Sequence, residues 1–195
     1  MDGNLTDHLM IDLETWSLER DAVIRAGVFI MFDAHGIGEA LYLDARPSID
    51  DQLENNRKIS QSTHQWWLKQ LLKLSDIIDT HRLQRTEVTS TYQIADTISS
   101  FLDQHKPRSI WSRHNMDLQV IRDLFSSLDL NNPWNYNQER DCSSFDDMLP
   151  APHSVVPHDP YCDCLAQIEH TQNALSLTVD VREITEFSEL KTQAE

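Results

Sequence analysis

Apolar runs in the first quarter of the chain predict β-strands. Residues 8–14, HLMIDLE, form a short apolar run that ends in carboxylates, and residues 22–33 form a longer run rich in Val, Ile and Phe. The turn at 33–38 contains two of the four glycines of the chain and leads into a third apolar segment at 39–45. The pattern therefore predicts an antiparallel meander at the start of the fold.

Apolar residues at helical spacing dominate the next part of the chain. They predict three helices and one short strand, at residues 60–79, 91–105, 117–128 and, between the last two, 108–112. Ser60 or Ser62 would cap the first of these helices.

A loop-rich segment with four prolines follows at residues 129–157. Within it, residues 138–149 are expected to hold a short strand or helix. Asp159 is a good helix N-cap and Pro160 a good first helical residue, so the last long helix is expected to begin there.

Strands at the start, with helices interleaved later, indicate an α/β protein in which helices cover a mixed sheet. A chain of 195 residues suits one domain better than two. We expect that domain over residues 1–180 and a polar C-terminal tail or peripheral helix over 181–195.

The composition is that of a soluble globular protein, with 39% hydrophobic and 25% charged residues. No apolar run approaches the roughly 20 residues that span a bilayer, and the first residues lack the features of a secretory signal. Three cysteines do not suggest a disulfide framework. We expect a cytoplasmic protein without a membrane partner, in the host cytoplasm if it is phage-encoded.

A formal net charge of -16 argues against broad electrostatic binding to a polyanion such as a long duplex. If nucleic acid is a ligand, something must neutralise the site. Divalent cations held by clustered carboxylates would do so while contacting only a few phosphates.

Acidic residues stand at the ends of several predicted elements. Asp12 and Glu14 are two residues apart on the first strand, so both side chains point to one face of the sheet. Burying them without a cation would be costly, and Mg²⁺ or Mn²⁺ favour carboxylate oxygens. Asp117 follows the fourth strand, and Asp163 lies in the last helix.

The stretch VPHDPYCDC, residues 156–164, allows two interpretations. Cys162 and Cys164 could join a nearby histidine or Cys142 in a zinc site. However, residues two apart on a helix lie on different faces, and a second pair with zinc-finger spacing is missing. We therefore interpret the cysteines as small packing residues. His158 lies just before the start of the predicted helix.

Five segments occur in an order typical of one enzyme superfamily. They are HLMIDLETW (8–16), HQWWLKQ (64–70), IWSRHNMDLQVI (110–121), ERDCSS (139–144) and PHDPYCDC (157–164). Together they resemble the DEDD superfamily of 3′-to-5′ exonucleases in its histidine subclass, the ribonuclease T-like group. The resemblance is greatest to its small phage and bacterial members, such as tailed-phage exonuclease A.

The resemblance covers roughly residues 8–177 and implies a ribonuclease H-like fold, an antiparallel meander plus parallel strands flanked by helices. It implies two Mg²⁺ or Mn²⁺ ions per site, held by Asp12, Glu14, Asp117 and Asp163. Glu14 would also position the attacking water, and His158 would be the general base, since histidine titrates near neutral pH.

The implied substrate is the 3′ end of single-stranded DNA or RNA. Trp66 and Trp67 are adjacent, so one is expected in the core and the other, Trp66, at the site, where it would stack on a base. Leu13, Thr15 and His114 complete the expected substrate-binding residues. A homodimer is also expected from the group.

The second motif departs from the group's usual pattern. A glycine usually follows the tryptophan and an aromatic residue precedes the aspartate, whereas here Arg113, His114 and Asn115 form a shorter loop and Met116 precedes Asp117. Asp123 is the less favoured substitute ligand. Ser143 also stands where an arginine is frequent in this subgroup.

Two other classes of function stay open on these residues. The altered second motif would suit a catalytically weakened protein that binds nucleic-acid ends or a protein partner. The cysteines would suit a zinc-dependent interaction module. The choice between DNA and RNA depends on contacts to the 2′ position, which no motif reveals.

Overall fold

Six strands form one mixed sheet in the part of the chain that this computed structural model describes, residues 7–74 and 84–192. The strands are β1 (His8–Thr15), β2 (Ile24–Phe32), β3 (Ile37–Asp44), β4 (Arg85–Glu87), β5 (Ser109–Ser112) and β6 (Glu139–Asp141). Their spatial order is β4-β3-β2-β1-β5-β6. β1, β2 and β3 form the expected antiparallel meander. β4 pairs in parallel with β3, β5 pairs in parallel with β1, and β6 pairs in parallel with β5.

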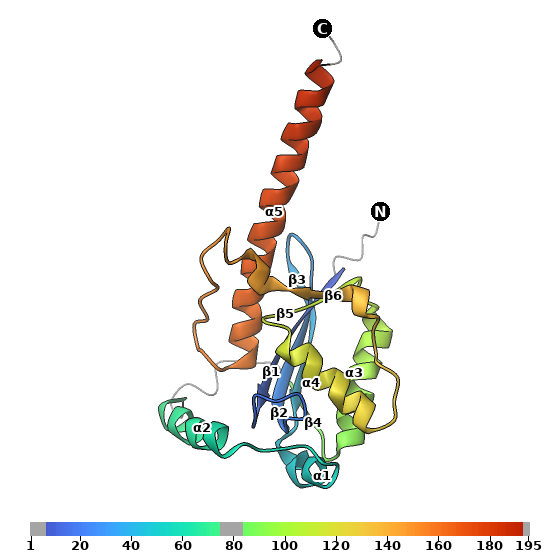
Figure 1. The fold of residues 1–195 in the computed structure, drawn as a ribbon, viewed down its shortest axis with the longest axis vertical. Coiled ribbons are helices and arrows are strands. Elements are labelled where there is room, and N and C mark those ends of the chain that lie inside the picture. Colours follow the sequence, from blue (N-terminus) through green and yellow to red (C-terminus); the bar gives the residue numbers. More distant parts are fainter. Residues whose placement is uncertain (1–6, 75–83, 193–195) are drawn as a thin grey trace.

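Helices flank this sheet, as Figure 1 shows. The α-helices of the described residues are α1 (Ile49–Glu54), α2 (Gln61–Leu74), α3 (Thr91–His105), α4 (Met116–Ser127) and α5 (Pro160–Thr192), with short 3-10 turns at Arg46–Ser48, Tyr136–Gln138 and Cys142–Phe145. The result is the predicted α/β class, consistent with a ribonuclease H-like fold.

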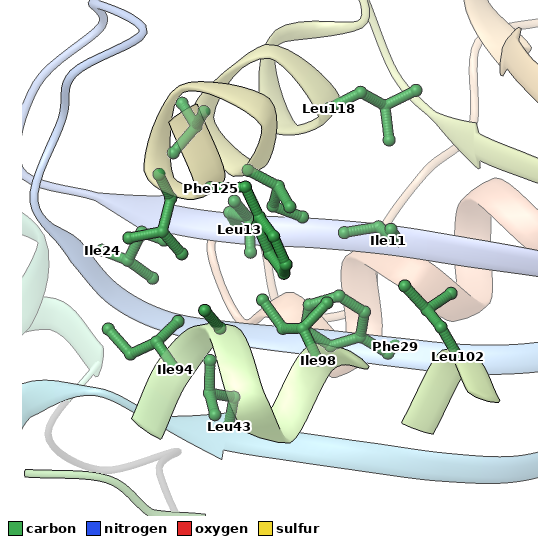
Figure 2. Close-up of a cluster of buried hydrophobic side chains, with 14 of the residues drawn as sticks. Ile11, Leu13, Ile24, Phe29, Leu43, Ile94, Ile98, Leu102, Leu118 and Phe125 are labelled. Carbon is green, nitrogen blue, oxygen red and sulfur yellow. The ribbon is translucent and has the colours of Figure 1, made fainter. Parts of the chain in front are cut away.

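The main core lies between the sheet and helices α3 and α4 (Figure 2). Alternate residues of β1 enter it, and Leu9 and Ile11 are fully buried. Ile98 of α3 and Phe125 of α4 meet them from the other side. Two helices thus cover one face of this strand with apolar contacts.

The opposite face of the sheet packs against α5. Met10 of β1 and Val28 of β2 join Cys164 and Ile168 of α5 in a second buried cluster. This core is smaller, and it covers only part of β1. Asp12 and Glu14, the later residues of β1 on this face, are therefore not part of this apolar cluster.

Most predicted elements are confirmed within a few residues. α3 has the predicted bounds, and α4 begins one residue before the predicted start. At α2 the cap is Ser60, whose Oγ accepts a hydrogen bond from the Thr63 backbone N–H at 3.1 Å. Residues 75–79 of that predicted helix lie outside the described residues.

The segment predicted as a short strand or helix contains one of each, β6 and a 3-10 turn. The predicted start of the last helix is also confirmed. Asp159 Oδ1 accepts from the backbone N–H groups of Tyr161 and Cys162 at 3.1 and 3.0 Å, and Pro160 is the first helical residue.

One α-helix and one strand of the described residues were absent from the prediction. Helix α1 has no apolar stripe, because its buried residue is Gln52, whose amide exchanges two 2.8 Å hydrogen bonds with the backbone of Ile24. Strand β4 has the sequence Arg-Thr-Glu, all three residues are exposed, and it pairs in parallel with β3. Neither element carries the hydrophobic pattern on which strand and helix prediction depends.

Helix α5 continues beyond the sheet toward the C-terminus (Figure 1). It runs to Thr192, so the division between a domain at 1–180 and a tail at 181–195 stays a prediction. Among the helices of the described residues, none is long and apolar enough to cross a membrane.

Candidate functional site

Asp12 and Glu14 emerge from β1 on the face that α5 covers. Their placement follows from strand alternation, because Leu13 between them points into the opposite core. Asp12 Oδ1 accepts a hydrogen bond of 2.8 Å from Gln167 Nε2 of α5. The Glu14 residue is only 6% exposed. The two carboxylates are thus held side by side along one strand.

Asp117 reaches the same place from the first turn of α4. Its Oδ1 accepts from the Leu13 backbone N–H of β1 at 3.3 Å, and the residue is buried. The short loop before it turns sharply, since His114 and Asn115 both have positive φ, 60° and 57°. That left-handed backbone is uncommon for residues other than glycine. The departure in the second motif therefore still brings Asp117 to β1.

His158 and Asp163 come from the start of α5. His158 also has a positive φ, 67°, and its backbone N–H donates to Asp163 Oδ2 at 2.9 Å. One ligand atom each from Glu14, His158 and Asp163 lies within 4.8 Å of the others. Residues predicted from distant motifs therefore meet at one point.

Burial raises the pKa of all four carboxyl groups, which we call the acidic cluster: Asp12, Glu14, Asp117 and Asp163. For Asp12, the negative charges of Asp117 and Asp163 raise the pKa further, and the Gln167 hydrogen bond lowers it. Burial raises the pKa of Asp117 to about 7. The acidic cluster is thus costly to ionise without a bound cation.

A basic side chain, Arg25, lies close to Glu14 of the acidic cluster. Burial and the charge of Asp12 raise the pKa of Glu14, and the positive charge of Arg25 lowers it. The Arg25 guanidinium stacks over the Trp67 ring, 4.4 Å from its centroid. This single cation cannot balance four carboxylates.

The donor set suits a hard divalent cation. It offers the carboxylate oxygens that Mg²⁺ and Mn²⁺ favour, with the His158 imidazole beside them. The candidate metal group found among the described residues contains no cysteine. The residues present therefore fit the ions expected from the sequence.

An aromatic cavity of about 470 Å³ opens beside Glu14. Its walls include Leu13, Thr15, Thr63, Trp66, Trp67 and His158. The Trp66 ring lies edge-on to the His158 ring with centroids 4.6 Å apart. Trp67 is buried, and its Nε1 donates to the Thr15 carbonyl at 2.9 Å. The structure thus places one tryptophan in the core and leaves Trp66 37% exposed.

A second, polar cavity of about 240 Å³ lies beside Asp12. Its walls include Asp12, Arg113, His114, Ser154, Asp163 and Gln167. His114 therefore lines a different cavity from the other three expected substrate-binding residues. Since one cavity borders Glu14 and the other borders Asp12, the two flank the acidic cluster.

Other candidates lie in different roles. Asp123 forms ion pairs with Arg20 and Arg57 at 3.7 and 3.6 Å, which ties it to neighbouring loops. Cys164 is buried, and its Sγ donates to the Val28 carbonyl at 3.6 Å. None of the three cysteines forms a disulfide bond, and the burial of Cys142 and Cys164 is in keeping with the packing interpretation. Ser143 donates from its backbone N–H and from its Oγ to Asp141 Oδ1.

Three residues at the site were not singled out from the sequence. Gln167 had a usable signal, because it follows Asp163 by one helical turn and so shares its face of α5. Arg113 was noted only as part of an unusual loop. Arg25 has no local signal, since it reaches Glu14 by pairing of adjacent strands.

Comparison with known proteins gives one family. The family model described as the Rv2179c-like 3′-5′ exoribonuclease domain matches residues 7–178, most of the 195-residue chain. No curated protein matches the chain. The matched range contains the whole acidic cluster and both cavities.

Proposed function

The chain belongs to the family of Rv2179c-like 3′-5′ exoribonuclease domains, and we propose that it removes nucleotides from the 3′ ends of single-stranded RNA in a metal-dependent reaction. Membership supports nuclease activity on a nucleic-acid substrate. The observation that carries the proposal is the convergence of Glu14, His158 and Asp163 beside an aromatic cavity. Asp12 belongs to the same cluster, because the charges of Asp117 and Asp163 raise its pKa. This donor set also supports the finer assignment to the histidine subclass of the DEDD superfamily.

Asp12, Glu14, Asp117 and Asp163 would hold two Mg²⁺ or Mn²⁺ ions. When bound, such ions supply neutralisation of the scissile phosphate and acidification of a water molecule. The raised pKa values support this role, because the buried carboxyl groups need a cation to ionise at neutral pH. Gln167 keeps Asp12 oriented through its 2.8 Å hydrogen bond.

His158 is proposed as the general base that takes the proton of the attacking water. Its side chain is exposed at the mouth of the site and within reach of Glu14 and Asp163. The tryptophan edge beside it limits the positions of the ring. A base at this place could accept a proton and pass it to solvent.

The terminal nucleoside is proposed to occupy the aromatic cavity. Trp66 offers an exposed ring for stacking, which is tolerant of base identity. Leu13 and Thr15 lie beneath it as parts of the wall. The cavity borders Glu14, so a base bound there would place its 5′ phosphate toward the acidic cluster.

The test is cleavage of a 5′-labelled RNA oligonucleotide with Mg²⁺ or Mn²⁺, beside DNA of the same sequence and RNA with a blocked 3′ end. We expect stepwise shortening of free RNA and protection by the block. His158→Ala should lower kcat by about 100-fold or more, as for loss of a general base, while calorimetry shows metal binding retained. Near-normal kcat in this variant would refute the assignment of the base.

The same assay separates the other classes of function. Binding of the oligonucleotide without shortening would favour a weakened nuclease that binds ends. Stoichiometric zinc in protein purified without chelators would favour the zinc module. Dimer formation and a cytoplasmic location stay predictions.

A further inference from the structure

The polar cavity has a feature that the aromatic cavity lacks, a cationic side chain in its wall. Among the described residues that line the two cavities, Arg113 is the one arginine or lysine. The chain as a whole has 16 basic against 32 acidic residues. Positively charged side chains are therefore scarce in this chain, and the position of Arg113 indicates where a phosphate could be bound.

Arg113 is held in a defined orientation. Its Nη1 and Nη2 donate to the two carboxylate oxygens of Asp146 at 3.1 and 2.7 Å. His170 Nε2 lies 3.3 Å from the same carboxylate. A forked contact of this kind fixes the guanidinium plane and leaves other N–H groups available for a further anion. The Arg113 side chain is 23% exposed.

The path of a bound strand follows from the two cavities. In the proposed function the terminal nucleoside lies in the aromatic cavity and the scissile phosphate lies at the acidic cluster. The rest of the RNA strand would then leave the site past Asp12 and Asp163. Those two carboxylates form one wall of the polar cavity, and Arg113 forms another. In the proposed function Asp12 and Asp163 hold the metal ions at the scissile phosphate. Arg113, the one arginine or lysine among the described residues that line this cavity, is therefore the group that can contact the next linkage.

We infer that the polar cavity binds the nucleotide on the 5′ side of the scissile bond. Arg113 would contact the phosphodiester on the 5′ side of that nucleotide. This inference rests on the proposed function and names the part of the substrate that the second cavity recognises. Arg113 acts as a positioning residue. It holds the strand so that the leaving 3′ oxygen stays at the acidic cluster.

The experiment uses RNA oligonucleotides with one neutral methylphosphonate linkage. One substrate carries it directly 5′ of the nucleotide next to the scissile bond, and the other carries it several linkages further upstream. For the wild type we expect kcat/KM to fall about 10-fold with the near substitution, as for loss of one charge-assisted contact. The distant substitution should change kcat/KM less than 2-fold.

In the variant Arg113→Gln, kcat/KM on unmodified RNA should fall about 10-fold, and the near methylphosphonate should cause no further fall in kcat/KM. Sensitivity equal to that of the wild type would overturn the inference. Arg122→Gln is the matched control, because Arg122 pairs with Glu139 on the surface of α4, and it should behave as the wild type.

A second variant separates positioning from a purely structural ion pair. Asp146→Asn removes the charge of the carboxylate but keeps one oxygen that can accept a hydrogen bond from Arg113. The near methylphosphonate should therefore still reduce kcat/KM, by a smaller factor than in the wild type. If Asp146→Asn instead abolishes that sensitivity as Arg113→Gln does, the pair is structural and the inference fails.

Binding measurements keep this test independent of cleavage. The dissociation constant of the same oligonucleotides is measured by fluorescence anisotropy with Ca²⁺ in place of Mg²⁺. Wild-type protein that binds with the expected sensitivity but does not cleave would refute the proposed activity and support the inference. Cleavage without any sensitivity at Arg113 would refute the inference alone.

Discussion

The eight residues of β1 alternate between two faces of opposite character. Toward α3 and α4, Leu9 and Ile11 are fully buried in an apolar core. Toward α5, Asp12 and Glu14 are placed where burial raises the pKa of each carboxyl group. One face therefore stabilises the fold, and the other reduces its stability at neutral pH unless a cation is bound.

This difference teaches how the site is kept in place. A cluster of buried carboxylates would tend to separate, so the strand that carries two of them needs a firm attachment elsewhere. β1 obtains it as the central strand, paired on both edges with β2 and β5. The site gains rigidity from neighbours that take no part in its chemistry.

The largest expected effect comes from removing one charge on the face toward α5. Asp12→Asn should lower kcat/KM by about 1,000-fold or more, because a proposed ligand for the metal is lost. The same change should raise the metal-free free energy of unfolding at pH 7, since it removes a buried carboxylate. Urea unfolding with EDTA measures this, and Asp96→Asn on the exposed side of α3 is the control. Loss of stability together with loss of activity would contradict the comparison.

The next effect comes from the opposite face. Ile11→Ala should lower the free energy of unfolding by roughly 2–5 kcal/mol, because it leaves a cavity in the core. Below its melting temperature the variant should keep metal affinity within a few-fold of the wild type. Ile11→Val is the milder control and should cost about 1 kcal/mol. A loss of metal binding in the folded variant would show that the two faces are not separable.

The pH dependence of stability sharpens the comparison further. Burial raises the pKa of Asp117 to about 7, against about 4 in an unfolded chain. The folded state therefore holds this proton longer, and the stability it contributes is present below about pH 4 and lost as pH rises through 7. Metal-free wild type should lose stability relative to Asp117→Asn across that range, by an amount on the order of a few kcal/mol. Thermal unfolding at pH 4, 5.5 and 7 with EDTA measures it, and an unchanged difference would contradict the shift.

The smallest effect is expected at the aromatic cavity. Trp66→Ala should raise KM about 10-fold with little change in kcat, because stacking on a base is worth about 1–3 kcal/mol. The Trp66 ring is partly exposed, so stability should change by less than the Ile11→Ala variant does. Steady-state kinetics on RNA of mixed sequence gives both constants. An unchanged KM would remove Trp66 from the substrate-binding residues.

Much of the fold was predictable where burial leaves a period in the sequence. The stripe of α3 and the alternation of β1 are examples, and Asp159 with Pro160 marked the start of α5. Helix α1 and strand β4 were not predictable, because Gln52 supplies the buried contact of one and edge pairing alone supports the other. Polar contacts and strand edges leave no hydrophobic pattern.

The site divides in a similar way. Asp12, Glu14, Asp117, His158 and Asp163 were expected from motif order, and the structure brings them together. Gln167 beside Asp12 and Arg25 beside Glu14 were not, since their contacts join elements far apart in the chain. A closer likeness to the small phage members of the superfamily also stays a prediction.

The sequence by itself determined the order of the main elements, the cap of α5 and the carboxylates and histidine that we propose as the site. These depend on local periodicity, on backbone preferences and on the chemistry of side chains, which are properties of short segments. Only the tertiary structure decided that a short loop of left-handed residues still delivers Asp117 to β1. It also decided that the acidic cluster lies between an aromatic cavity and a cavity with one arginine. Such arrangements depend on how α4, α5 and the sheet pack, and no single segment encodes that packing.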